Sequence, residues 1–127
     1  MNEILIKIGS LYNILLIVFH LMFWRLFNWQ EELRAISFLN SAVMQVLNIS
    51  ITLVFIIFCL ISLVYTKELL QTSLGHSLLI LISLFWLARA IQQVIFFKLK
   101  HWGSWAFTVF FLLGATLYGI PAISVHR

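Results

Sequence analysis

The sequence has few charged residues, one cysteine and one proline. Only 9% of its 127 residues are charged, whereas an average soluble domain has about 25%. A folded chain of this size still exposes roughly one third of the surface of its unfolded form. The hydrophobic residues, 63% of the chain, therefore cannot all be buried in a core. We expect the remainder to face lipid, as in an integral membrane protein.

The single cysteine, Cys59, excludes an internal disulfide, CxxC redox chemistry and a thiolate metal cluster. The formal charge of +4 comes from Lys and Arg residues that are scattered singly along the chain. No basic stripe is present to neutralise a run of phosphates, so we expect no nucleic-acid partner. Scattered cations near helix ends suit anionic membrane lipids instead.

Four apolar segments are long enough to cross a membrane, since a span needs about 20 mainly apolar residues. The polar breaks between them are short, at residues 28–34, 66–68 and 98–101. Short connections make neighbouring helices antiparallel. We therefore predict an all-α, up-and-down bundle of four transmembrane helices in one domain, residues 1–127, with both termini on one side. The predicted spans are 8–27, 38–65, 74–97 and 102–125.

The first span is expected to be retained, because no small-residue cleavage site follows it. Lys and Arg are nearly balanced between the two sides, so the positive-inside rule leaves the orientation open. We expect a multi-pass protein of the bacterial inner membrane. Aromatic residues at the headgroup level support the span ends. They are Trp24, Trp29, Tyr65, Trp102 and Trp105.

One face of the second span carries small and polar side chains at alternating steps of four and three residues. We expect this stripe to face the bundle interior, because its amides would otherwise be stranded in hydrocarbon. Its polar groups then either form a site or simply hydrogen-bond between helices as packing contacts. The stripe consists of Ser41, Gln45, Asn48, Thr52, Phe55, Cys59 and Ser62.

Arg89 is the one cation deep within a predicted span, and it shares a helix face with Trp86 and Gln93. All four glutamates lie at span ends or in breaks, so Arg89 has no acidic partner at its depth. Either the side chain snorkels to the headgroups, or its charge is met by polar groups, lipid phosphate or an anionic ligand.

His20 lies on one face of the first span together with Asn13 and Trp24. At about 1.5 Å of rise per residue, His20 lies about 18 Å and Arg89 about 22 Å from the terminal side. The same count brings polar groups of all four helices into one layer, which we predict as a binding site for a lipid or small amphipathic anion. The candidate binding residues are His20, Trp24, Gln45, Asn48, Trp86, Arg89, Gln93 and Thr108.

The predicted layer contains no catalytic set, metal site or cofactor site. His76 lies close to the terminal side and cannot face His20 at one depth, which argues against bis-histidine haem ligation. In the fourth span, small residues four apart, such as Ala115 and Gly119, favour close packing within the chain or in a homo-oligomer. Pro121 is expected to end or kink that helix.

Three functions fit these observations. We favour a binding protein without enzymatic activity, acting in transport or as an accessory to a membrane partner. The second is a membrane enzyme acting on a lipid-like substrate, with His20 as acid or base and Arg89 holding an anionic group. The third is a purely structural membrane subunit. The enzyme is the weaker candidate, because no nucleophile, metal set or paired carboxylate accompanies the histidine.

Overall fold

The computed structural model describes residues 2–97 and 102–125, and nearly all of this part is helical. Four of its helices are long and apolar enough to cross a membrane, which suggests a multi-pass membrane protein. The elements are α1 (Asn2–Leu21), α2 (Phe23–Leu26), α3 (Trp29–Glu32), α4 (Phe38–Val64), α5 (Thr66–Gln71), α6 (Ser73–Gln92), a π-helical turn η1 (Gln93–Phe97) and α7 (Trp102–Val125).

Helices α4, α6 with η1, and α7 coincide closely with three of the four predicted spans, whereas α1 begins and ends earlier than the first predicted span. The prediction started after Lys7, but α1 already begins at Asn2, and Glu3 in its first turn suits the positive end of the helix dipole. At the other end, the backbone N–H of Met22 is shared between the carbonyls of Val18 and Phe19. Such shared hydrogen bonds are typical of helix ends. The chain then continues in the short helix α2.

The polar breaks contain more helix than the sequence suggested. Residues 66–68 open helix α5, and Thr72 caps α6 by accepting a 2.9 Å hydrogen bond from the backbone N–H of Gly75. In the first break, Asn28 has a φ of 50°, a left-handed conformation that asparagine tolerates better than most residues. It turns the chain into α3. The third predicted break, 98–101, lies outside the described residues.

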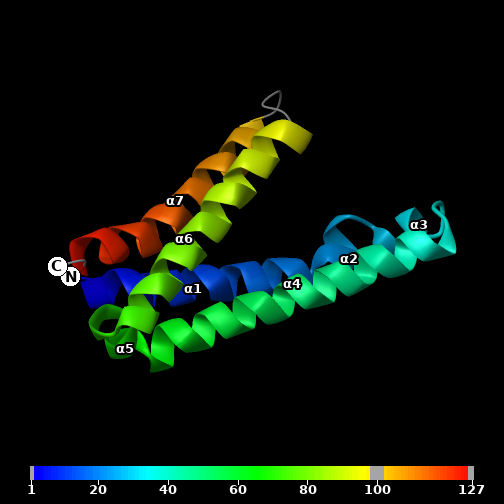
Figure 1. Cartoon of the computed structure of the whole chain (residues 1–127). Coiled ribbons are helices and arrows are strands. Elements are labelled where there is room, and N and C mark those ends of the chain that lie inside the picture. Colours follow the sequence, from blue (N-terminus) through cyan, green and yellow to red (C-terminus); the bar gives the residue numbers. More distant parts are fainter. Residues whose placement is uncertain (1, 98–101, 126–127) are drawn as a thin grey trace.

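The helices form a V of two antiparallel hairpins (Figure 1). The first arm runs from α1 to α4, with α1 packed on α4, and the second arm consists of α6, η1 and α7. The arms meet where α1 packs on α7, near both chain termini, and diverge toward the other end. We call these the closed end and the open end. The up-and-down order and the shared side of the termini follow the prediction, whereas the divergence of the arms was not predicted.

Glycines let the two arms approach closely at the closed end. A Cβ atom on Gly9 of α1 would lie 2.7 Å from Cζ of Tyr118 on α7. A Cβ atom on Gly114 of α7 would lie 2.6 Å from Cζ of Tyr12 on α1. Each tyrosine ring therefore occupies the space left by a glycine on the opposite arm. This reciprocal packing holds α1 against α7.

A buried polar network joins three helices at the same place. The Tyr118 hydroxyl accepts a 2.8 Å hydrogen bond from Nδ2 of Asn13 and lies 2.7 Å from the Ser62 hydroxyl. Asn13 Nδ2 also donates to the carbonyl of Gly9, and Ser62 donates to that of Phe58. Among the described residues only Asn13 Oδ1 of this network has no partner. Polar groups of the closed end thus mainly satisfy one another.

Small residues of α7 pack within the chain, against α6. Ser83 donates a 2.7 Å hydrogen bond to the carbonyl of Ala115, and a Cβ atom on Gly119 would lie 2.9 Å from the Ser83 hydroxyl. The helix does not end at Pro121 but continues to Val125. Its last turns bend away from the line of the rest (Figure 1), as expected near a proline inside a helix.

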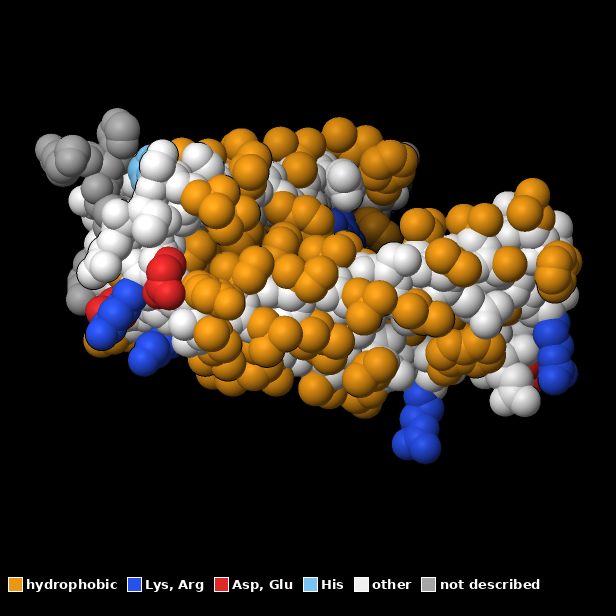
Figure 2. All heavy atoms as spheres, turned by 60° about the horizontal axis from the view of Figure 1, so that its bottom comes forward, with side chains coloured by type: hydrophobic (Ala, Val, Ile, Leu, Met, Phe, Trp, Pro, Cys, Tyr) orange, Lys and Arg blue, Asp and Glu red, His pale blue; other side chains and the backbone are white. Residues whose placement is uncertain are grey.

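The outer surface is mostly apolar. Figure 2 shows a broad band of hydrophobic side chains between charged groups at the closed end and others toward the far end of the first arm. Large apolar side chains, above all leucine and isoleucine, are exposed on every long helix. Such a surface suits contact with lipid tails, and it agrees with the four membrane-length helices.

Candidate ligand-binding cleft

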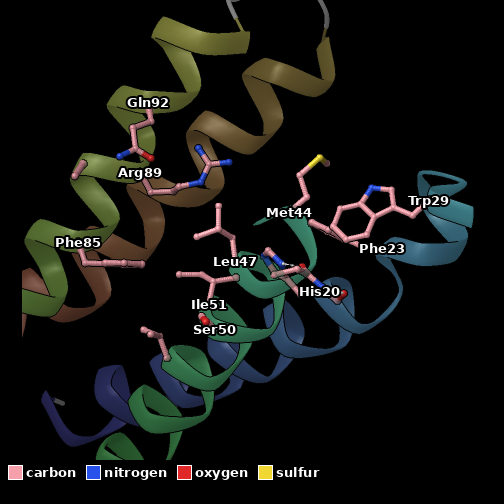
Figure 3. Close-up of a pocket in the computed structure, with 13 residues that line it drawn as sticks. His20, Phe23, Trp29, Met44, Leu47, Ser50, Ile51, Phe85, Arg89 and Gln92 are labelled. Carbon is pink, nitrogen blue, oxygen red and sulfur yellow. Dashed lines mark hydrogen bonds between the residues drawn. The ribbon is translucent and has the colours of Figure 1, made fainter. Parts of the chain in front are cut away.

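The two arms enclose a cleft at the open end. It comprises two adjoining pockets of similar size, about 650 and 620 Å³, which share lining residues such as His20 and Arg89 and have mainly aromatic and aliphatic walls. This size falls within the range of small-molecule sites, roughly 300 to 1,000 Å³. Figure 3 shows side chains of both arms directed into it. The lining includes His20, Phe23, Trp29, Met44, Leu47, Asn48, Ile51, Phe85, Trp86, Arg89, Gln92, Gln93, Phe107 and Phe111.

Arg89 enters the cleft from the second arm, near the last turn of α6 (Figure 3). Its Cζ atom lies 4.5 Å from the ring centroid of Phe111, which makes a cation–π contact across to α7. Within residues 2–97 and 102–125 its guanidinium has no ion pair and no hydrogen bond. A half-buried arginine with five unused donors is a strong candidate to bind an anion.

The backbone changes from α-helix to π-helical turn just beyond Arg89. Gln93, the first residue of η1, is buried and points Nε2 toward the Ser104 hydroxyl of α7 at 3.5 Å. π-Helical turns are rare and often occur at functional sites. Here the turn places Gln93 in the wall of the cleft, between Arg89 and the N-terminal part of α7.

His20 and Asn48 form a pair of hydrogen bonds between α1 and α4 in the first arm. His20 Nδ1 lies 2.8 Å from Asn48 Oδ1, and Asn48 Nδ2 donates to the His20 carbonyl at 3.1 Å. Both residues line the cleft, and Figure 3 shows His20 on the first arm across from Arg89 on the second. The ring of Phe23 lies 4.3 Å from the imidazole, between centroids. His20 is therefore held from two sides.

Trp86 closes the inner end of the cleft at the centre of an aromatic cluster. It is fully buried, stacks on Phe55 and Phe111 at centroid distances of 5.4 and 5.9 Å, and meets Tyr12 edge-on at 5.0 Å. Its indole Nε1 has no hydrogen-bond partner in the described part of the chain. The cluster separates the cleft from the closed end.

Five of the eight candidate binding residues line the cleft: His20, Asn48, Trp86, Arg89 and Gln93. The other three lie elsewhere. Trp24 is exposed and meets Trp29 edge-on, Gln45 donates back to Ser41 on its own helix, and Thr108 donates to the carbonyl of Ser104. Depth along a helix and a shared helix face brought these eight together in the sequence, but neither determines which face of a helix borders the cleft.

The polar stripe of α4 divides along its length. Its C-terminal members, Thr52, Phe55, Cys59 and Ser62, are buried, as predicted. Its N-terminal members, Ser41, Gln45 and Asn48, are half-buried, because the second arm has diverged from α4 there.

Sequence reasoning missed the aromatic walls of the cleft. Phe23, Trp29, Phe85 and Phe111 line it, but phenylalanine is common throughout this chain and carries no positional signal. Trp29 was assigned only to the headgroup level, yet it is buried against Phe23 at a centroid distance of 5.5 Å. The contact of Arg89 with Phe111 joins two separate helices, and a single-helix pattern cannot reveal it.

The part of the chain that the structure describes has no group of three His, Cys, Asp or Glu side chains that could hold a metal ion. His20 hydrogen-bonds through its ring to Asn48, not to a serine, threonine or cysteine. No family model, curated protein or solved structure matches the chain. Its function is therefore inferred from the chemistry of the cleft.

Proposed function

We propose that the cleft binds an anionic lipid, with the anionic head group on Arg89 and the apolar part along the aromatic walls. The observation that carries this proposal is the unpaired guanidinium of Arg89 inside an apolar cleft, among the described residues. An arginine within a membrane costs about 2.5 to 3.5 kcal/mol on insertion scales. A bound anion would offset that cost.

The walls of the cleft support an amphipathic ligand over a small inorganic anion. Phe23, Phe85 and Phe107 offer apolar contact area next to Arg89, and a free phosphate would leave it unused. A lipid can also enter sideways from the bilayer between two diverging arms. In this proposal the protein is a multi-pass protein of the bacterial inner membrane that carries or presents such a lipid, in transport or as an accessory to a membrane partner.

The test compares the lipids that remain bound to purified variants, using native mass spectrometry with phosphatidylglycerol and phosphatidylcholine added in equal amounts. Charge-assisted hydrogen bonds contribute about 1.5 to 3 kcal/mol, so Arg89→Gln should weaken phosphatidylglycerol binding roughly 10- to 100-fold. Arg89→Lys should restore it only in part, since lysine lacks the planar fork of donors.

Arg25→Gln is the matched control, because it removes the same charge from an exposed side chain of α2 outside the cleft. It should bind phosphatidylglycerol like wild type. If Arg25→Gln and Arg89→Gln lost phosphatidylglycerol binding equally, the loss would reflect the net charge of the protein and not a site at Arg89. Undiminished binding in Arg89→Leu would refute the proposal and favour a structural role for the bundle.

A further inference from the structure

Asn48 fixes the position of the proton on the His20 ring. The His20 carbonyl can only accept a hydrogen bond, so the Asn48 amide must turn its Nδ2 donor toward it, at 3.1 Å. Asn48 Oδ1 then faces His20 Nδ1 at 2.8 Å and can only accept. Nδ1 must therefore donate. With the opposite amide orientation, Asn48 Oδ1 would face the His20 carbonyl oxygen, and neither atom could donate a hydrogen bond.

A neutral imidazole with a proton on Nδ1 has a lone pair on Nε2. In the described part of the chain, Nε2 has no hydrogen-bond partner, and His20 lines the cleft. The cleft thus offers an acceptor from the first arm and the guanidinium donors of Arg89 from the second (Figure 3). A ligand that spans the arms can use both.

We propose that the cleft selects lipids whose anionic phosphodiester also carries a hydroxyl group, and that this hydroxyl donates to Nε2 of His20. This inference rests on the proposed function. An ammonium group could also donate to Nε2, but it would bring a second positive charge into the cleft that holds Arg89. A hydroxyl adds a donor without adding charge. Asn48 acts as a positioning residue, because it sets the proton on the ring without meeting the ligand donor itself.

The test uses two lipids that differ in this donor. Phosphatidylglycerol and phosphatidylmethanol carry the same charged phosphodiester, but only phosphatidylglycerol has head-group hydroxyls. In native mass spectrometry with both lipids present, wild-type protein should prefer phosphatidylglycerol about three- to tenfold, the effect of one hydrogen bond. His20→Phe should bind the two equally, and its binding of both should still exceed that of phosphatidylcholine.

His76→Phe is the matched control, because His76 lies in the first turns of α6 and does not line the cleft. It should keep the wild-type preference. If His20→Phe does not fold, Asn48→Leu keeps the ring and should still lower the preference, because Nδ1 loses its acceptor. In ¹⁵N NMR spectra of labelled histidine, wild-type His20 should carry its proton on Nδ1, and Asn48→Leu should show a mixture of tautomers.

The outcomes separate the two proposals. If wild-type protein binds both anionic lipids equally well and better than phosphatidylcholine, the hydroxyl inference is wrong and the proposed function stands. If it binds neither better than phosphatidylcholine, the proposed function is wrong as well. A proton on Nε2 of wild-type His20, alone or together with one on Nδ1, would overturn the inference directly.

Discussion

The closed and open ends of the V contain similar kinds of residue but use them differently. At the closed end, Tyr118, Asn13 and Ser62 bond to one another around a contact between α1 and α7. At the open end, Arg89 meets only aromatic rings and His20 has one ring nitrogen unused, within the described residues. Polar groups that satisfy one another stabilise a fold, whereas unsatisfied ones are available to a ligand.

We expect the largest loss of stability at the closed end from a side chain added where two helix backbones are in contact. A Cβ atom on Gly75 would clash with the carbonyl oxygen of Glu68 and with Cα of Leu69, and backbone atoms cannot move aside as a side chain can. We expect Gly75→Ala to lower the free energy of unfolding by roughly 3 kcal/mol. Gly103→Ala is the control, since nothing lies within 4 Å of its added Cβ. Equal stability of both variants in detergent unfolding would contradict this packing.

The polar network of the closed end should contribute less than its backbone packing. Tyr118→Phe removes the hydroxyl that links Asn13 to Ser62, and we expect a loss of roughly 1 to 2 kcal/mol. Tyr65→Phe, at an exposed helix end, should change stability by less than about 0.5 kcal/mol. Thermal unfolding of both variants measures the difference. If Tyr118→Phe were no less stable than Tyr65→Phe, the network would have no stabilising role.

A smaller effect is expected from the pair of hydrogen bonds at the open end. Asn48→Leu removes both bonds to His20 but keeps the size of the side chain. Interhelical hydrogen bonds in membranes contribute about 0.6 kcal/mol on average, so we expect a loss of roughly 1 kcal/mol or less. Chemical unfolding in lipid-free detergent checks it. If Asn48→Leu lost more free energy of unfolding than Tyr118→Phe, the polar groups of the open end would contribute more to stability than those of the closed end, contrary to our expectation.

The smallest effect on stability should come from Arg89, the residue most tied to binding. Arg89→Leu loses the contact with Phe111 and gains a residue that is favourable in apolar surroundings. In lipid-free detergent we therefore expect its free energy of unfolding to stay within about 1 kcal/mol of wild type. With phosphatidylglycerol added, only wild-type protein should gain stability. Equal gains in both proteins would show that the lipid stabilises them from outside the cleft.

The comparison also explains which parts of the site could be predicted. Arg89 and His20 could be found in the sequence, because a charged or titratable residue is rare in an apolar run. Trp24 was grouped with His20 by a shared helix face, and Gln45 by its place in the polar stripe and its depth, but the structure places both outside the cleft. Depth follows from counting residues, but the facing of a side chain depends on where the neighbouring helix lies.

The sequence by itself determined the helices and their order. Apolar runs of membrane length predict helices, because a backbone in lipid must satisfy its own hydrogen bonds, and short breaks make consecutive helices antiparallel. Only the tertiary structure decided that the arms diverge and enclose a cleft. Their separation depends on contacts between distant positions, such as Gly9 with Tyr118 at the closed end and Arg89 with Phe111 at the open end. Such contacts leave no periodic pattern in the sequence of any single helix.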